Sequence, residues 1–137
     1  MGTRSMIGME TDNGIQAVYC HWDGYPSNNG RLLLENYTDS KKVQQLISLG
    51  DLSFLGEEIG EKHNFDTAAK EHHEWCCAYH RDRDDDYNID EVQDQNEFLG
   101  LDRGTEFWYL FTKDGTWVFA SDDNKNLGSL TMEDCKD

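Results

Sequence analysis

The sequence predicts an α+β domain in which a mostly antiparallel sheet of four or five strands packs against two or three helices. One strand pair opens the chain, a second closes it, and two segments with helical spacing stand between them. The length of 137 residues suits one domain with a single core. We expect this domain to span residues 1–121, followed by a polar, acidic C-terminal tail over residues 122–137 whose last residues fray.

The first strand pair is predicted over residues 5–11 and 15–22. Asp12-Asn13-Gly14 separates the two runs, and its Asn-Gly step suits the positive φ angles of a tight hairpin turn. Gly24-Tyr25-Pro26 then ends the second strand, because Gly and Pro favour turns. The chain is therefore expected to begin with a hairpin that leads into a loop.

Two helices are predicted in the next segment. The first, a short one, follows the polar Ser-Asn-Asn of residues 27–29 and has three consecutive leucines on its inward side. The second begins after Thr38 or Asp39 and ends at Gly50, because its apolar residues recur at helical spacing. A further helical turn is predicted within residues 52–59, before a polar connection.

The middle of the chain is interpreted as a strand over residues 74–80 with a helical or loop start. Trp, Cys and Tyr suit a pleated surface, although a helix over residues 68–77 is the alternative. The densely acidic residues 82–94 are predicted to face water, and a short helix is expected near Phe98.

A second hairpin is predicted over residues 106–111 and 116–120. Lys113-Asp114-Gly115 provides the turn between the two runs. Aromatic residues alternate along the first run, with Phe107, Tyr109 and Phe111 on one side and Trp108 and Leu110 on the other.

The formal net charge of −16 comes from 28 acidic and 12 basic side chains. Such a surface repels phosphate backbones, because nucleic-acid affinity comes chiefly from Lys and Arg. Direct binding of DNA or RNA is therefore disfavoured, whereas basic surfaces of other proteins are attracted. The alternative is that the charge only keeps the protein soluble.

No apolar run approaches the length of a membrane span, and the first residues lack the apolar core of a signal peptide. We therefore expect a cytoplasmic protein with no membrane partner. In that compartment the four cysteines, Cys20, Cys76, Cys77 and Cys135, are expected to be reduced thiols.

Four motifs carry a resemblance: G-T-R-S at residues 2–5, Y-C-H-W-D-G-Y-P at 19–26, G-D-L-S at 50–53 and Y-H-R-D-R at 79–83. With the closing aromatic hairpin, they resemble a family of small phage and prophage proteins over nearly the whole chain. The sequence departs from that pattern at residues 84–86, where three aspartates stand in place of Gly-Glu. The resemblance implies a phage accessory protein in a bacterial cytoplasm, a class that includes inhibitors of host enzymes and defence systems.

The first candidate site combines Arg4 with His21, Asp23 and Tyr25. Hairpin pairing places the start of the first strand beside the end of the second, where these side chains could bind an anionic ligand or perform acid–base chemistry through His21. The alternative is structural: Asp23 caps the turn, Tyr25 packs, and Arg4 pairs with an acid.

A second candidate anion site consists of Tyr79, Arg81 and Arg83. Two arginines two residues apart share one face of a strand and could hold a phosphate or carboxylate bidentately. The alternative is that both neutralise their acidic neighbours, Asp82 and residues 84–86.

Metal ligation is considered for His72, His73, Cys76, Cys77 and His80. Their donor atoms suit zinc, but no second ligand pair stands at the separation of a standard zinc finger. We therefore expect core thiols and surface imidazoles, and no cofactor.

The acidic segment also echoes a calcium-binding loop, with oxygen-bearing residues at alternate positions: Asp82, Asp84, Asp86, Asn88 and Asp90. Tyr87 stands where such a loop needs Gly, and Gln93 stands where it needs a bidentate Glu. A solvated acidic loop is the favoured interpretation.

The sequence lacks a Gly-rich phosphate loop and a nucleophilic serine motif, so a conventional enzyme is not indicated. The leading hypothesis is an acidic phage accessory protein that inhibits a host defence or nucleic-acid-handling protein by docking on its basic surface, in effect as a mimic of DNA. The alternative is a protein that sequesters or hydrolyses a small anionic ligand, using the Arg, His, Asp and Tyr residues of the two candidate anion sites.

Overall fold

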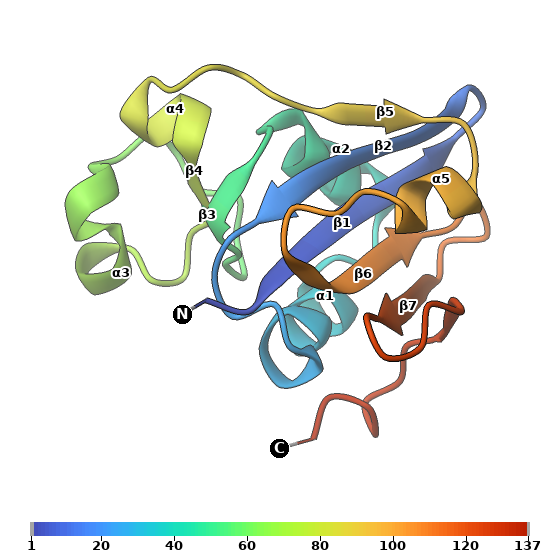
Figure 1. The fold of residues 1–137 in the computed structure, drawn as a ribbon. Coiled ribbons are helices and arrows are strands. Elements are labelled where there is room, and N and C mark those ends of the chain that lie inside the picture. Colours follow the sequence, from blue (N-terminus) through green and yellow to red (C-terminus); the bar gives the residue numbers. More distant parts are fainter. Residues whose placement is uncertain (1, 137) are drawn as a thin grey trace.

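The computed structural model describes residues 2–136 and has a mixed α/β fold with one eight-stranded sheet and five α-helices (Figure 1). The strands are β1 (Arg4–Thr11), β2 (Gly14–Cys20), β3 (Leu52–Phe54), β4 (Cys77–Ala78), β5 (Asp90–Val92), β6 (Thr105–Phe111), β7 (Trp117–Ser121) and β8 (Gly128–Ser129). The α-helices are α1 (Arg31–Asn36), α2 (Ser40–Ser48), α3 (Ala68–Glu71), α4 (Tyr79–Arg83) and α5 (Gln95–Leu99). A π-helical segment, Pro26–Gly30, precedes α1, and a 3-10 turn, Phe65–Thr67, precedes α3.

The strand order is β4-β3-β2-β1-β6-β7-β8, and β5 pairs with β2 beyond this path. β1 pairs with β6 in parallel, as does β2 with β3, and the other pairs are antiparallel. The predicted mixed α and β architecture with a mostly antiparallel sheet is therefore confirmed. The expected four or five strands and two or three helices are fewer than the eight strands and five α-helices of the described residues.

Both predicted hairpins are present. β1 and β2 pair from Ser5 with Cys20 to Thr11 with Gly14, around the Asn-Gly turn. β6 and β7 pair from Phe107 to Phe111, the latter opposite Trp117. Parallel pairing of β1 with β6 joins the two hairpins in the middle of the sheet, so both ends of the chain contribute to one sheet.

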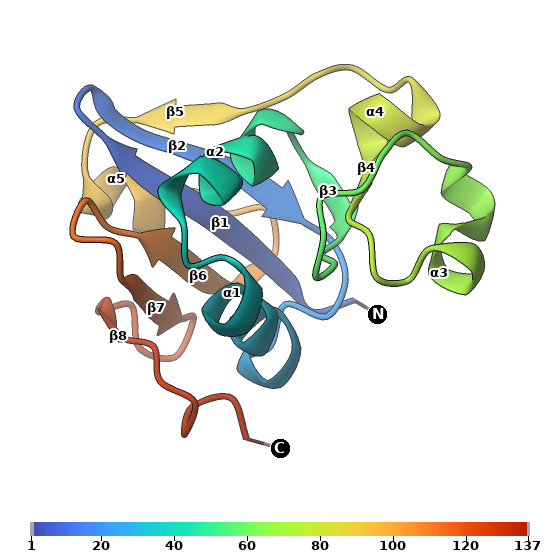
Figure 2. The ribbon, with the colours of Figure 1, turned by 180° about the vertical axis from the view of Figure 1, so that it is seen from behind.

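Apolar side chains along the central strands point alternately to the two faces of the sheet, so a hydrophobic core forms on each face. Ile7 and Tyr109 pack with residues of α1 and α2 on one side. Met6 and Trp108 pack with Phe98 of α5 on the other. Figures 1 and 2 show these helices on opposite faces of the sheet. The alternation predicted for the aromatic strand is confirmed, because side chains on successive residues of a strand point to opposite faces.

The second predicted helix is α2, which begins after Asp39 and ends before Gly50. The Asp39 carboxylate accepts a hydrogen bond from Lys41 N at 3.4 Å, as expected of an N-capping residue. The short helix near Phe98 is α5, which Asp94 caps by accepting from Glu97 N. The first short helix is α1, entered through the π-helical segment.

Two local predictions in the middle of the chain are wrong. The helical turn expected after Gly50 is strand β3, because Leu52 pairs with Cys20 of β2 and with Ala78 of β4. The strand expected over residues 74–80 is limited to β4, and Tyr79 begins α4. The Asp82 carboxylate reaches back to accept from Ala78 N at 2.8 Å, which stabilises the first turn of that helix.

Two acidic segments are more ordered than the sequence suggests. Asp90–Val92 forms β5 at the edge of β2, within the stretch predicted to face water. The segment predicted as a polar tail adds β8 to β7 and buries Leu130 and Cys135 in the core. Arg31 donates from Nη2 to the Cys135 carbonyl at 2.9 Å, so this segment packs on the domain as far as Cys135.

Candidate functional site

The loop after β2 holds Trp22 at the surface. Gly24 donates its N–H to the Thr3 carbonyl at 2.8 Å, and its own carbonyl accepts from the buried Tyr109 hydroxyl at 2.6 Å. Asp23 takes a left-handed conformation with a φ of 57°. These contacts fix the loop on both sides, and the Trp22 side chain projects with 43% of its surface exposed.

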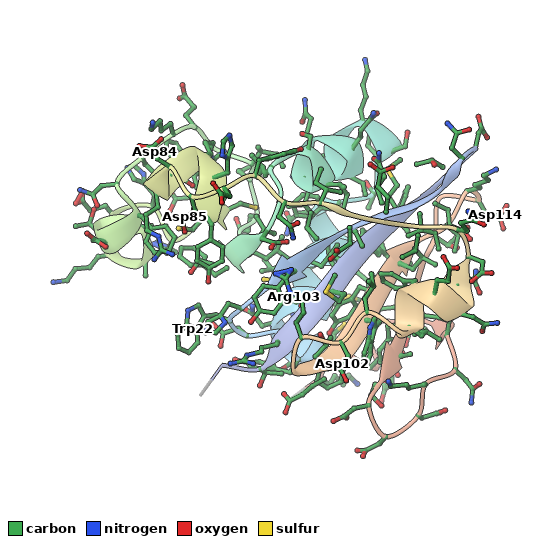
Figure 3. The ribbon with its side chains drawn as sticks, turned by 45° about the horizontal axis from the view of Figure 1, so that its top comes forward. Trp22, Asp84, Asp85, Asp102, Arg103 and Asp114 are labelled. Carbon is green, nitrogen blue, oxygen red and sulfur yellow. The ribbon has the colours of Figure 1, made fainter. Side chains whose placement is uncertain are left out.

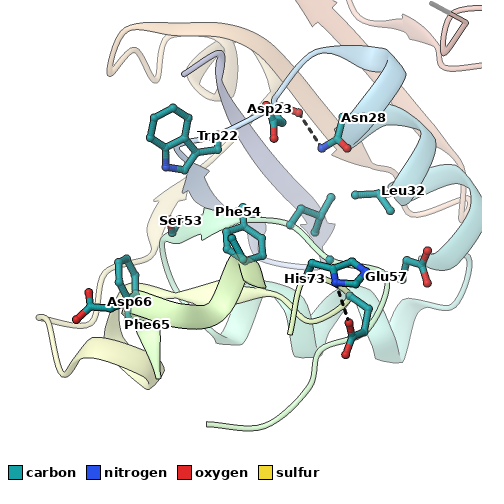
Figure 4. Close-up of a pocket in the computed structure, with 14 residues that line it drawn as sticks. Trp22, Asp23, Asn28, Leu32, Ser53, Phe54, Glu57, Phe65, Asp66 and His73 are labelled. Atoms are coloured by element: carbon teal, nitrogen blue, oxygen red, sulfur yellow. Dashed lines mark hydrogen bonds and ion pairs between the residues drawn. The ribbon is translucent and has the colours of Figure 1, made fainter. Parts of the chain in front are cut away.

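Trp22 borders a hollow of about 590 Å³ between the loop after β2, β3 and the segment that leads into α3 (Figure 4). Apolar side chains from these three parts, from α1 and from α3 line it: Trp22, Leu32, Phe54, Leu55, Phe65 and Ala69. An exposed indole beside a cavity of this kind is typical of a binding site, because burying it on contact removes a large apolar surface from water.

The charge of the hollow has one sign. Its acidic lining residues are Asp23, Glu57, Asp66 and Glu74, and none of the described residues that line it is Lys or Arg. His73, also in the lining, has its Nδ1 at 3.5 Å from the Glu74 carboxylate. Aromatic rings surrounded by carboxylates favour a cation, because both the π face and the carboxylates attract positive charge. We call this site the acidic aromatic pocket.

Arg81 directs its donors to groups of the chain itself. Its Nε and Nη2 donate to the Asp82 carboxylate at 3.0 and 3.2 Å. Nη1 donates to the Ile59 carbonyl at 2.9 Å, and Nη2 also donates to the Cys76 carbonyl at 2.8 Å. Because the donors of Arg81 are used within the protein and only 16% of its side chain is exposed, it ties α4 to the segment after β3.

Arg83 lies at the surface of the same helix. Its guanidinium is 2.6 Å from the Asp85 carboxylate and stacks over the rings of Phe65 and Tyr79, at 4.5 and 5.0 Å. The structural alternative stated for these arginines, that they neutralise acidic neighbours, therefore agrees with the contacts of both Arg81 and Arg83.

The residues of the first candidate site, which combined Arg4 with His21, Asp23 and Tyr25, do not all lie in one place. Arg4 and His21 lie together at the end of the hairpin, where partial burial and the Arg4 charge lower the pKa of His21. His21 Nδ1 is 2.7 Å from the Tyr19 hydroxyl. Asp23 belongs to the acidic aromatic pocket instead, and accepts from the Tyr25 hydroxyl at 3.4 Å.

A second depression contains a residue that the sequence analysis missed. Arg103 binds the Asp51 carboxylate at 2.6 and 3.0 Å, and its guanidinium lies 4.3 Å above the Tyr19 ring. Tyr79 and Arg83 line the same depression beside Asp84, Asp85 and Asp86. Figure 3 labels Arg103, Asp84 and Asp85 of this group. Both arginines are already paired with aspartates, so an anion would have to compete with carboxylates for them. Nothing in the sequence near Arg103 signals this role.

The alternating acidic residues do not converge on a calcium site. Asp82 is buried with Arg81, Asp84 pairs with Lys62 at 3.4 Å, and Asp90 points toward Arg103. Burial raises the pKa of Asp90 above its ordinary value, which the Arg103 charge partly offsets.

The metal ligands considered in the sequence analysis also do not converge on one point. His72 stacks on Trp75 at 4.2 Å, and the His80 ring reaches the Asp85 carbonyl at 2.8 Å. Cys76 directs its sulfur to the buried Tyr37 hydroxyl at 3.2 Å. Among the candidates, Cys77 alone joins a group of potential ligands found within residues 2–136, and its neighbours there are His63 and Asp82, which the sequence analysis did not consider together.

Comparisons of the chain with protein-family models, with curated proteins and with solved structures find no match. Among the helices of residues 2–136, none is both long and apolar enough to cross a membrane.

Proposed function

We propose that the protein acts by binding a basic partner protein, and that the acidic aromatic pocket holds an exposed Arg or Lys side chain of that partner. The observation that carries the proposal is the position of the exposed Trp22 indole at the border of a hollow whose charged lining residues are acidic. An arginine from the partner would stack on Trp22 and pair with the carboxylates of Asp23, Glu57 or Asp66.

The rest of the surface supports the same kind of partner. Within the part of the chain that the structure describes, seven basic side chains form ion pairs with carboxylates of the chain itself: Lys42, Lys62, Arg81, Arg83, Arg103, Lys113 and Lys136. The carboxylates that are not paired in this way give the electrostatic field around the protein its negative sign. Such a field accelerates encounters with basic surfaces and repels polyanions.

The resemblance to small phage and prophage proteins suggests where the partner is found. In this proposal it is a host protein in the bacterial cytoplasm, such as a defence or nucleic-acid-handling protein, whose basic surface the bound chain covers and thereby inhibits. A small anionic ligand is supported less well, because Arg81, Arg83 and Arg103 are held by aspartates.

A labelled peptide of alternating arginine and glycine, compared with the same peptide carrying glutamine for arginine, tests the pocket by fluorescence anisotropy. We expect the arginine peptide alone to bind, and binding to weaken strongly between 0.05 and about 0.5 M salt. Trp22→Ala should weaken it about 30-fold, the loss of about 2 kcal/mol typical of a central aromatic residue.

Asp66→Asn and Asp114→Asn provide a matched pair, because each removes one exposed carboxylate. Asp66 lines the acidic aromatic pocket, whereas Asp114 lies in the turn between β6 and β7. Asp66→Asn should weaken peptide binding several-fold more than Asp114→Asn. Equal effects of the two, together with no effect of Trp22→Ala, would show diffuse attraction to the acidic surface and would exclude the pocket.

A further inference from the structure

Three side chains with metal-binding donors meet beneath α4. One ligand atom from each of His63, Cys77 and Asp82 lies within 4.8 Å of the other two. Cys77 has no exposed surface, and the side chains of His63 and Asp82 are 3% and 0% exposed. The three come from separate parts of the fold: the segment after β3, strand β4 and helix α4.

The His63 ring has one nitrogen, Nε2, that makes no hydrogen bond within the described chain and could ligate a metal. Its Nδ1 lies 2.7 Å from the Glu61 carbonyl, which requires that this nitrogen carry the proton and donate, and the same nitrogen is 3.5 Å from the Asp82 carboxylate. Nε2 is then a bare lone pair, and this buried atom has no hydrogen-bond partner within the described chain. An unpaired buried acceptor is costly. Metal-ligating histidines have the same arrangement, with one ring N–H donated to a carbonyl and the other nitrogen on the metal.

The other two side chains complete a donor set. The Asp82 carboxylate is held in place by Arg81 and by the backbone N–H groups of Ala78 and His63, at 2.8 and 3.1 Å. The Cys77 thiol is unoxidised and makes no hydrogen bond within residues 2–136. An imidazole, a thiolate and a carboxylate are the three ligand types that zinc takes in proteins, and the thiolate disfavours magnesium and calcium.

We propose that His63, Cys77 and Asp82 bind one zinc ion. Cys77 ligates as the thiolate and releases its proton to solvent, while Asp82 keeps Arg81 as a hydrogen-bond partner and ligates through one oxygen. Zinc commonly takes four ligands, and a water molecule completes the set where the protein supplies three. The bound ion connects the segment that leads into α3 to helix α4.

Cobalt(II) is the probe for this site, because a cobalt–thiolate bond adds a charge-transfer absorption that carboxylates cannot produce. Full-length protein freed of metal with a chelator should develop this band up to one cobalt per chain, and zinc should remove it. Cys77→Ser should abolish the band, and His63→Gln should weaken cobalt binding more than about 100-fold, since losing a mere hydrogen-bond partner of a ligand costs 10–100-fold.

His73→Gln is the matched control, because it removes an exposed imidazole of the same segment and should leave the band unchanged. If Cys77→Ser does not fold, zinc protection of Cys77 from alkylation in the unaltered protein, mapped by mass spectrometry, replaces it. Absence of the band in the unaltered protein, or a band that survives Cys77→Ser, would overturn the proposal. Alkylation of Cys77 at the same rate with and without zinc would do the same.

Discussion

Replacing Arg81 with alanine should lower the free energy of unfolding by about 3–5 kcal/mol, the cost of breaking a buried ion pair by removing one partner. The substitution leaves the Asp82 carboxylate buried without its guanidinium, and it frees the carbonyls of Ile59 and Cys76. These contacts join α4 to the segment that carries Phe65 and Asp66. We therefore expect the acidic aromatic pocket to lose its shape in Arg81→Ala.

Arg83→Ala is the control, because Arg83 lies on the same helix and also pairs with an aspartate, yet its side chain is 50% exposed. An exposed pair contributes about 0–1 kcal/mol, so this variant should unfold at nearly the denaturant midpoint of the unaltered protein. Urea unfolding followed by circular dichroism distinguishes the two. Similar losses in both variants would contradict the structural role assigned to Arg81.

Alkaline pH should destabilise the protein steeply. Burial raises the pKa of Cys20 and of Cys77 to about 12 from an ordinary value of 9.0, and burial raises the pKa of Tyr37 and Tyr109 far above 10.0. Above pH 9 the unfolded chain therefore loses protons that the folded chain keeps, and stability falls as pH rises. The limiting slope for each group is about 1.4 kcal/mol per pH unit, and it is approached only above the ordinary pKa, so in the metal-free protein the two thiols together cost about 2 kcal/mol between pH 9 and 10.

Denaturant unfolding at pH 7, 8, 9 and 10 under reducing conditions measures this dependence. The free energy of unfolding should vary little between pH 7 and 8 and then decrease with an increasing slope. Cys20→Ala should reduce the loss of stability between pH 9 and 10 by about 1 kcal/mol, whatever its effect at neutral pH. A stability that stays constant up to pH 10 would mean that these thiols ionise in the folded protein.

The elements with strong local signals could be predicted. The Asn-Gly turn gives the first hairpin, and Asp39 with Gly50 bounds α2. The start of α4 could not be predicted, because Asp82 determines it by bonding to Ala78 N, and Asp82 is itself held by Arg81. Likewise the acidic β5 is a strand only because the edge of β2 is available to pair with it.

The candidate site was predicted only in part. Trp22 and Asp23 belong to a motif that the sequence analysis singled out, but their partners Phe65 and Asp66 lie more than forty residues later and have no local pattern. The grouping of His63 with Cys77 depends on the path of the long segment that connects β3 to β4. The sequence correctly indicated the acidic net charge, whereas the position of the carboxylates around an exposed indole required the fold.

Binding of a cationic side chain beside Trp22 is the central claim, and nuclear magnetic resonance of the nitrogen-15-labelled protein tests it most directly. On addition of the arginine–glycine peptide, the indole N–H of Trp22 and the backbone amides of Phe65 and Asp66 should shift together, whereas a DNA duplex should shift none of them. Shifts caused by the duplex, or peptide shifts confined to residues 84–86 with Trp22 unmoved, would contradict it.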